Sequence, residues 1–463
     1  MRSALLAVFL VATGLVGVSS AETYKVSDLK TLADLVGGKA GPGDIIELAY
    51  GTYYLDVPRI NVESSGTPDQ PLIIRGIMQD GKRPVIDASR VNVKRCVLCA
   101  RPNSHDVIFE NLEICNAWGS RFSDKEKYGV NATAIYFEES NNITVRNCES
   151  HNNEDGFFAT HNADFILIDG CSIHHNGTLN KEPHNGTHNF YFCARHQMVK
   201  NCYIGHANES QNWKSRGGNT IFAFNWVEEE YSYSLGADSD NEQNTLWLGN
   251  LVMKRTFEGM GQGRIGGLGD GTGVARGTVV VLNNTFVTVR PRDFHLFTEH
   301  SSTGDFYCVN NAFVGPGMLF LDHNGQGKVY GTNNWIAGEA LNVPYAMDKT
   351  IRNDDIYPKG FNAQKLEFRA EEGSEVVDAG VPSDEYLKAV KMVTQYSRGE
   401  GQVIKPSPAW LAALEEIEKP APAYEPVTQG AGFQPRPYDG HIDLGAYEYV
   451  KGASTESTAA ATK

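Results

Sequence analysis

A short pattern recurs along most of the chain: a run of β-branched and aromatic residues, a turn that contains Asn or Gly, and a second short apolar run. Examples are NITVRNCESH, TIFAFNWVEE and FYCVNNAFVG. The turn residues lie 23 to 36 residues apart, and they are Asn111, Asn147, Gly170, Asn201, Asn225, Asn250, Asn284, Asn311 and Asn334. Repeats of this period are typical of solenoids, in which each unit packs only against its neighbours.

Within each unit, apolar and polar residues alternate over a few positions, which indicates a strand with one buried face. No amphipathic helix of ten or more residues lies between the units, which excludes βαβ units and therefore a TIM barrel or a doubly wound sheet. The leucine spacing of leucine-rich repeats is also absent. We therefore predict an all-β fold, a right-handed parallel β-helix whose turn asparagines stack as hydrogen-bonded ladders.

The two ends of the chain differ from the repeats. Residues 1–21 combine an early Arg, an apolar run and a small-residue end, and we interpret them as a secretory signal peptide. VSDLKTLADLVGG predicts an amphipathic helix that covers the open end of the coil, where strand edges are unpaired. We expect the β-helix domain to span 22–350. A C-terminal extension with two helical stretches, DEYLKAVKMV and PAWLAALEEIE, should pack on it over 351–450, before a disordered tail at 451–463.

Charge and cysteine content narrow the possible partners. The formal net charge of −15 argues against nucleic acid or an anionic membrane as partner, because both require a basic face. Cys148, Cys171 and Cys202 recur at one point of the repeat, so we expect a buried column of thiols. Cys96 and Cys99 favour a local disulfide or plain packing over zinc, since no second pair stands at zinc-finger spacing. We predict a secreted or periplasmic monomer without a membrane span.

The segments PGDIIELAYGTYYLD, PLIIRG and PVIDAS, followed by rungs with Asn turns, resemble secreted right-handed parallel β-helix proteins, above all polysaccharide lyases and pectin-degrading enzymes. The closing segment RPYDGHIDLGAYEY is similar to the end of many of those chains. The resemblance covers nearly the whole mature chain. It implies the same fold and an acidic polysaccharide as the substrate.

One rung, NESQNWKSRGGN at residues 208–219, resembles a rung of the alginate lyase and chondroitinase B family. In that family the rung carries a calcium-binding Glu, then a Lys-Ser pair whose Lys is the catalytic base, then an Asn turn. The resemblance implies that Glu209 is a calcium ligand and that Lys214 abstracts the proton. The next rung of the family carries an Arg-His pair, where this chain has Gly236 and Ala237.

The β-elimination reaction of such lyases sets clear chemical requirements. A cation neutralises the uronate carboxylate, a base removes the C5 proton, and an acid protonates the leaving oxygen. Because residues i and i+2 share one face of a strand, we expect Lys214 and Arg216 to point outward together, with Ser215 inward. We assign Lys214 as the base and Arg216 as the group that neutralises the carboxylate.

The preceding rung, HNGTHNFYFCARH, supplies two further catalytic candidates. Counting back from the turns at Asn201 and Asn225 places residues 188–192 beside 212–216 on adjacent strands. This position predicts proton-handling roles for His188 and Tyr191. Three more basic residues are expected to bind substrate: Arg195, His206 and Arg264.

Other acidic residues point to a metal and to alternative reactions. ADSDNEQN places carboxylates at alternate positions, which suits calcium, and the predicted ligands are Glu209, Asp238 and Asp240. Adjacent Glu154 and Asp155 offer a carboxylate pair for hydrolysis, although neighbours on a strand face opposite ways. Our leading prediction is a secreted polysaccharide lyase. A glycoside hydrolase, a uronan epimerase and a non-catalytic glycan-binding surface protein are the alternatives.

Overall fold

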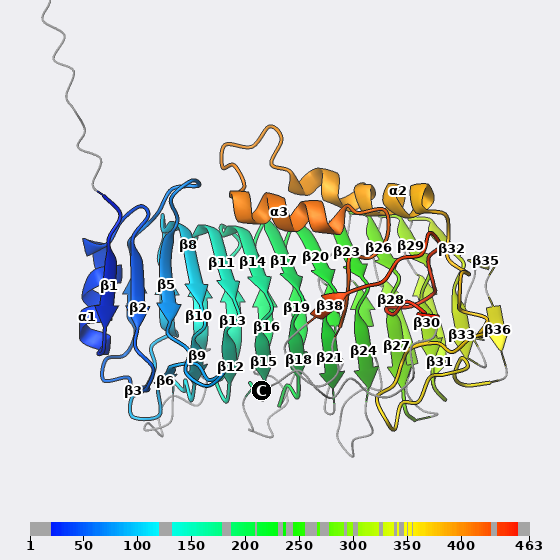
Figure 1. Ribbon diagram of the computed structural model, residues 1–463, viewed down its shortest axis with the longest axis horizontal. Helices are drawn as coiled ribbons and strands as arrows, with labels where there is room; N and C mark the ends of the chain where they lie inside the picture. The colour runs from blue at the N-terminus through cyan, green and yellow to red at the C-terminus, as the bar shows by residue number, and fades with distance from the viewer. Residues whose placement is uncertain are drawn as a thin grey trace, which may run out of the picture.

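The computed structural model describes residues 20–451 except for the segments 120–131, 178–186, 209–210, 230–234, 238–243, 255–265, 269–276, 291–293, 300–303, 324–326, 338–339, 342–346, 350, 354 and 427–432. The described residues wind into a parallel β-helix with three long parallel sheets, which we call sheets A, B and C (Figure 1). The predicted fold class is confirmed. Most of the predicted signal peptide and of the predicted tail lies outside the described residues.

Each sheet takes its strands from successive turns of the coil. Sheet A consists of β1 (Thr23–Val26), β2 (Ile45–Leu48), β5 (Leu72–Gly76), β8 (His105–Glu110), β11 (Asn141–Arg146), β14 (Asp164–Asp169), β17 (His196–Lys200), β20 (Asn219–Ala223), β23 (Asn244–Leu248), β26 (Val279–Leu282), β29 (Phe306–Val309), β32 (Val329–Thr332) and β35 (Met347–Asp348). Sheet B consists of β3 (Thr52–Tyr54), β6 (Val85–Asp87), β9 (Glu113–Cys115), β12 (Glu149–His151), β15 (Ser172–His174), β18 (Tyr203–Gly205), β21 (Trp226–Glu229), β24 (Leu251–Lys254), β27 (Thr285–Thr288), β30 (Ala312–Val314), β33 (Trp335–Ala337) and β36 (Ile351–Asn353). Sheet C consists of β4 (Ile60–Val62), β7 (Cys96–Ala100), β10 (Thr133–Phe137), β13 (Asp155–Ala159), β16 (Phe190–Phe192), β19 (Trp213–Ser215), β22 (Leu235–Ala237), β25 (Gly266–Leu268), β28 (Phe294–Glu299), β31 (Met318–His323) and β34 (Ala340–Leu341).

The interior of the coil is filled by columns of apolar side chains that follow the strand register. In sheet C, Phe157, Phe190 and Trp213 occupy consecutive paired positions, and all three are fully buried. Side chains of a strand alternate between its two faces, so the residue next to each of these three on its own strand points away from the core. The outward-facing residues of sheet C therefore include Phe158, Tyr191 and their neighbours in the register.

The turn between sheets A and B is two residues long, and each of its positions forms a column along the coil. The first position has left-handed backbone, with φ from 49° to 63°, in Asn111, Asn147, Gly170, Asn201, Phe224, Gly249, Asn283, Asn310 and Asn333. At the second position, each member donates its backbone N–H to the side chain of the next one, over 2.9 to 3.4 Å, in the series Cys148, Cys171, Cys202, Asn225, Asn250, Asn284, Asn311 and Asn334. The predicted asparagine ladder is confirmed from Asn225 onward. The row predicted from the sequence, however, joined members of two different columns.

Cysteines fill the start of the second column, as predicted. Cys148, Cys171 and Cys202 are free and buried. The sulfur atoms of Cys171 and Cys202 each accept the backbone N–H of the preceding cysteine of the column, and that of Cys148 donates to the carbonyl oxygen of Arg146. Burial raises the pKa of the Cys148 and Cys171 thiols well above its ordinary value, so both stay protonated. Cys96 and Cys99, in contrast, are joined as a local disulfide in sheet C.

Gly170 is a position where the free-energy cost of left-handed backbone can be measured without a steric clash. Its φ is 63°, and a Cβ atom added there would meet nothing within 4 Å. Gly170→Ala is therefore expected to lower the free energy of unfolding by about 1 kcal/mol through backbone strain alone. Gly170→Asn should cost less, because Asn tolerates this conformation. Urea denaturation of the two variants tests this order, and an equal loss in both would contradict the strain argument.

A short helix closes the N-terminal end of the coil, as the sequence predicted. Helix α1 (Leu29–Asp34) begins after Asp28, whose side chain accepts the backbone N–H of Thr31 at 2.7 Å, and a π-helical turn (Leu35–Lys39) continues it. Figure 1 places α1 at the end of the coil beside β1. It turns a row of buried apolar residues toward the first rungs: Leu29, Leu32, Leu35 and Val36. The helix thus covers apolar residues that the first coil would otherwise expose.

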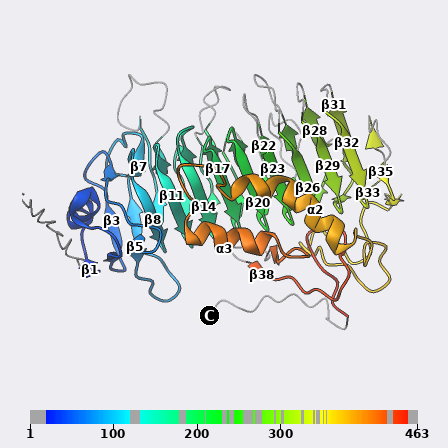
Figure 2. The same ribbon diagram turned by 90° about the horizontal axis from the view of Figure 1, so that it is seen from above.

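The C-terminal extension returns along the coil. Helices α2 (Ser383–Thr394) and α3 (Pro408–Ile417), joined through a 3-10 turn (Gln395–Ser397), lie along sheet A (Figure 2). Trp410 of α3 is fully buried, and its ring centroid lies 5.4 Å from that of Phe165 on β14. Segments between Tyr357 and Tyr447 pack on the later strands of sheet B, and β37 (Tyr424–Pro426) pairs with β38 (Phe433–Pro435). Among the described residues, the apolar clusters of the extension therefore cover sheets A and B but not sheet C.

Candidate active site on sheet C

The two predicted cations lie on the outer face of sheet C. Strand β19 pairs with β16 so that Lys214 lies beside Tyr191, and the flanking Trp213 and Ser215 are fully buried. Lys214 and Arg216 are both partly exposed. The predicted alternation, with Lys214 and Arg216 outward and Ser215 inward, is therefore confirmed.

The predicted register between these two strands was wrong by one residue. Counting back from Asn201 and Asn225 would pair Tyr191 with Ser215, whereas the structure pairs Tyr191 with Lys214. The count failed because Asn201 occupies the first column of the turn and Asn225 the second. The true equivalent of Asn201 is Phe224, which has the same φ of 58°. The corrected register puts Tyr191 and Lys214 on one face.

A row of aromatic rings leads to the cations. Tyr136, Phe158 and Tyr191 occupy consecutive paired positions on β10, β13 and β16, with ring centroids 5.1 Å and 4.8 Å apart. Nζ of Lys214 and Cζ of Arg216 each lie 5.8 Å from the ring centroid of Tyr191. Both distances are within the range of cation–π attraction, so both cations are held against the same ring.

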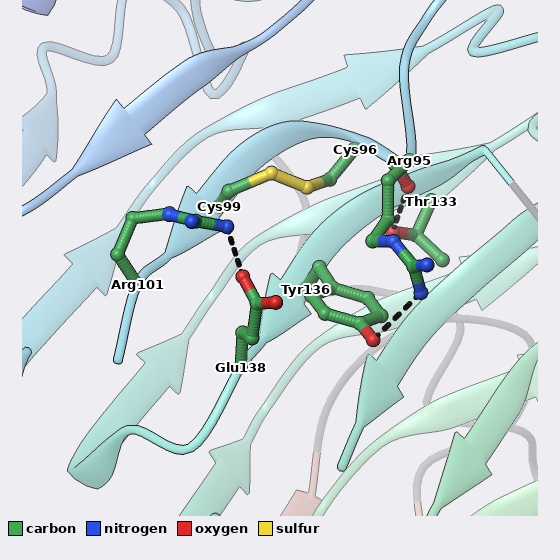
Figure 3. Close-up of a disulfide and its surroundings, with 7 residues drawn as sticks. All are labelled: Arg95, Cys96, Cys99, Arg101, Thr133, Tyr136 and Glu138. Atoms are coloured by element: carbon green, nitrogen blue, oxygen red, sulfur yellow. Dashed lines mark hydrogen bonds and ion pairs between the residues drawn. A yellow bond between two sulfur atoms is a disulfide. The ribbon is translucent and has the colours of Figure 1, made fainter. Parts of the chain in front are cut away.

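The other end of this row is anchored to β7 (Figure 3). Arg95 donates from Nη1 to the hydroxyl of Tyr136 at 2.9 Å, and Arg101 forms an ion pair with Glu138. The Cys96–Cys99 disulfide lies on the same strand, where Cys99 pairs with Tyr136. Burial raises the pKa of Tyr136, so its phenol stays neutral. Sequence reasoning missed Tyr136 and Arg95, although the repeated aromatic residues in AIYF, GFFA and NFYF were a signal for the row.

His188 is buried beside the same tyrosine. It is 2 % exposed, its ring centroid is 5.2 Å from that of Tyr191, and its Nδ1 accepts the backbone N–H of Gln211 at 3.2 Å. Burial, followed by the charges of Lys214 and Arg216, lowers the pKa of His188 well below 6.5. The imidazole is therefore neutral, with its proton on Nε2. This state suits a hydrogen-bond donor and leaves proton abstraction to other groups.

The buried neutral state of His188 predicts a pH effect on stability. The unfolded chain protonates this imidazole below about pH 6.5, while the folded protein resists protonation, so stability is present above that pH and is lost as the pH falls. The loss from this group approaches about 1.4 kcal/mol per pH unit. Urea denaturation between pH 7 and 5 should show a shallower decline for His188→Gln than for the wild type. The exposed His161 provides the control, because His161→Gln should keep the wild-type slope.

Two other predicted substrate-binding residues have described positions. Arg195 is exposed in the turn between β16 and β17. His206 follows β18 of sheet B, where its Nε2 is 3.7 Å from Oε2 of Glu228 and its ring packs near that of His175. These contacts of His206 are made with Glu228 on β21 of sheet B and with His175, which follows β15 of the same sheet. The sequence motif could not reveal this, because neighbouring residues of one rung belong to different faces of the coil.

The other residues predicted for this site have no described position. Arg264 and the predicted calcium ligands Glu209, Asp238 and Asp240 lie outside the described residues. Calcium binding therefore stays a prediction.

The carboxylate pair considered for hydrolysis has structural roles. Glu154 is 1 % exposed and accepts the backbone N–H groups of Gly119 and Ala132 at 2.9 and 2.8 Å. Asp155 is fully buried and accepts the backbone N–H of His188 at 2.6 Å. Both carboxylates thus hold backbone segments next to the site, which does not favour hydrolysis by this pair.

Comparison with known proteins returned structures but no family. No family model and no curated protein matches the chain. A pectate lyase, Pel9A, is similar at 13% identity and a TM-score of 0.49, over 79% of this chain and 93% of that one. A PL6 family polysaccharide lyase from Pseudopedobacter saltans is 12% identical with a TM-score of 0.39, over 74% of this chain and 94% of that one. A GH136 lacto-N-biosidase from Eubacterium ramulus is also 12% identical with a TM-score of 0.39, over 72% of this chain and 67% of that one. The strand pairing itself shows that the chain is a parallel β-helix protein. Its chemistry has to be argued from its own residues.

Proposed function

We propose that this protein is a secreted polysaccharide lyase that cleaves a uronate-containing polysaccharide by β-elimination on the outer face of sheet C. The observation that carries the proposal is the placement of Lys214 and Arg216 on one partly exposed face, both against the ring of Tyr191. Elimination next to a carboxylate needs a cation and a proton-transfer group within reach of the same sugar ring. No helix among the described residues has the length and apolar character to span a membrane.

Each group has a defined role in this reaction. The guanidinium of Arg216 binds the uronate carboxylate and stabilises the negative charge that develops there when C5 loses its proton. Lys214 first gives up its ammonium proton to solvent and then removes the C5 proton as the neutral amine. The bond between C4 and the leaving oxygen then breaks, the C4=C5 double bond forms, and the hydroxyl of Tyr191 protonates the oxygen. The neutral His188, whose ring lies beside that of Tyr191, supplies Nε2–H as a hydrogen-bond donor.

An assay on a panel of acidic polysaccharides tests the proposal. The unsaturated C4=C5 end absorbs in the ultraviolet and is made only by elimination, so a lyase produces this absorbance together with new reducing ends. New reducing ends without absorbance would identify a hydrolase. Exchange of the C5 proton with deuterated solvent without cleavage would identify an epimerase, and binding alone a glycan-binding protein. Each of these three results would overturn the proposed reaction.

Calcium is part of the proposal through the predicted ligands Glu209, Asp238 and Asp240. Oxygen ligands of this kind select calcium over softer ions. We expect chelation to lower the lyase activity and added Ca²⁺ to restore it, while Mg²⁺ does not. Activity that survives chelation and dialysis would exclude a calcium requirement.

A further inference from the structure

The outer face of sheet B holds a group of metal-ligand side chains that the proposed reaction does not use. Glu113 and Cys115 are separated by the inward-facing Ile114 on β9, and Cys115 pairs with His151 on the adjacent strand β12. One potential ligand atom from each of Glu113, Cys115 and His151 lies within 4.8 Å of the other two. We call these three residues the sheet B thiol site.

The ligand types select a class of ion. A thiolate, an imidazole and a carboxylate bind Zn²⁺ and similar transition metals, whereas calcium and magnesium prefer oxygen alone. In a tetrahedral site with bonds of about 2.0 to 2.3 Å, ligand atoms lie roughly 3.4 to 3.7 Å apart. Nε2 of His151 is already 3.1 Å from Oε1 of Glu113. Small side-chain rotations are therefore enough to gather all three atoms around one ion.

Cys115 differs from the cysteines of the internal column. Cys148, Cys171 and Cys202 belong to the apolar core of the coil, whereas Cys115 lies on the outward side of β9, beside Asp87 of β6. It is a free thiol at 4 % exposure. A thiol surrounded by carboxylates and an imidazole gains little from apolar packing, so packing does not explain why Cys is present at this position.

Neighbouring side chains orient the ligands. Nδ2 of Asn116 lies 3.4 Å from Sγ of Cys115, and the side chain of Asn152 contacts Nδ1 of His151 at 3.1 Å. The ring of His174 stacks on that of His151 with centroids 5.4 Å apart and 8° between the planes. A metal-bound imidazole donates its other N–H, so the Asn152 amide has to present Oδ1 to Nδ1 of His151 when Nε2 binds the ion, and this contact then fixes the ring.

The surrounding charge also favours a cation. Asp87 and Glu149 add carboxylates on the strands next to Cys115 and Glu113, and Glu149 is itself paired with Arg83 at 3.0 Å. Burial, followed by the charges of Asp87 and Glu113, raises the pKa of the Cys115 thiol to about 12. An incoming ion therefore has to displace the thiol proton, as metal ions do at cysteine ligands.

We propose that Glu113, Cys115 and His151 bind one divalent transition-metal ion of the Zn²⁺ class, which links β9 to β12 on the outside of the coil. Three protein ligands leave a fourth position for water. The site is separate from the cations of sheet C and does not depend on the proposed lyase reaction.

Cobalt provides a direct test, because a thiolate bound to Co²⁺ gives a charge-transfer absorption in the near ultraviolet. The untagged, metal-free full-length mature protein should bind one equivalent of Co²⁺ with this absorption, and Zn²⁺ should displace it. Cys115→Ser should abolish the absorption. His151→Gln and Glu113→Gln, at partly exposed positions that tolerate substitution, should weaken Co²⁺ binding roughly tenfold or more, which corresponds to about 1.4 kcal/mol. If Cys115→Ser does not fold, these two variants decide the question by affinity.

Matched controls separate the site from general thiol and imidazole binding. Cys193→Ala removes another buried thiol that is not in a disulfide, and His161→Gln removes an exposed imidazole away from β9 and β12. Both should keep the wild-type Co²⁺ spectrum and affinity. The proposal fails if wild-type protein shows no charge-transfer absorption, if Cys115→Ser retains it, or if the two controls lose binding as strongly as the site variants.

Discussion

Lys214→Ala is expected to lower kcat for β-elimination by about 10³-fold, since a positioned general base contributes about 10² to 10⁴ in rate. The lysine amine is the proposed acceptor of the C5 proton, and its Nζ lies 5.8 Å from the ring centroid of Tyr191 on the neighbouring strand. The loss should fall mainly on kcat, because proton removal occurs only in the transition state. The measurement is the initial rate of ultraviolet absorbance on the polysaccharide that the wild type cleaves.

Arg216→Ala and Lys391→Ala complete that experiment. In the proposed reaction Arg216 binds the carboxylate before and during proton removal, so its loss should raise KM as well as lower kcat. Lys391 is an exposed lysine of α2, which packs on sheet A, and its removal should leave both constants unchanged. Full activity in both Lys214→Ala and Arg216→Ala would remove the site from sheet C altogether. A loss of activity in Lys391→Ala equal to that in Lys214→Ala would indicate a general charge effect instead of catalysis.

The repeats of the chain were sufficient to predict the fold, because period-2 strands without intervening helices leave few ways to bury their apolar faces. They did not determine the exact strand register. Asn suits both columns of the turn: it tolerates the left-handed backbone of Asn201, and its amide both donates and accepts in the ladder at Asn225. Asn thus occurs at two adjacent positions of the turn, so a strand register counted from the turn asparagines can be wrong by one residue.

An error of one residue matters for the site because it exchanges the inner and outer faces of a strand. The prediction for Lys214 and Arg216 was unaffected, since their own alternation within β19 sets their direction. The predicted register between neighbouring rungs was wrong. The aromatic row from Tyr136 to Tyr191 depends on this register, so the sequence did not predict it. His206 shows the same limit, because its rung neighbours lie on another sheet. Burial of His188 is likewise a property of the assembled coil and cannot be read from a local motif.

Asn284→Ala is expected to lower the free energy of unfolding by about 3 to 5 kcal/mol, because it breaks the ladder in the middle. Oδ1 of Asn284 accepts both the backbone N–H and Nδ2 of Asn250 at 3.0 and 2.9 Å, and its Nδ2 donates to the carbonyl oxygen of Trp247 at 2.9 Å and to Oδ1 of Asn311 at 3.0 Å. All of these groups are buried, so water does not replace the lost partner. Each unsatisfied buried group costs about 1 to 3 kcal/mol.

The first rungs of the same column suggest a matched variant. There the sulfur of a cysteine takes the place of the amide: Sγ of Cys202 accepts the backbone N–H of Cys171 at 3.4 Å. Asn284→Cys should therefore lose less stability than Asn284→Ala, because a weak acceptor remains for the backbone of Asn250. Asn162→Ala, at an exposed position with one long side-chain contact, should change stability by less than about 0.5 kcal/mol. Urea denaturation of the three variants tests the order. Equal losses for Ala and Cys at position 284 would show that the ladder depends on the amide donor and not on acceptance of the neighbouring backbone N–H.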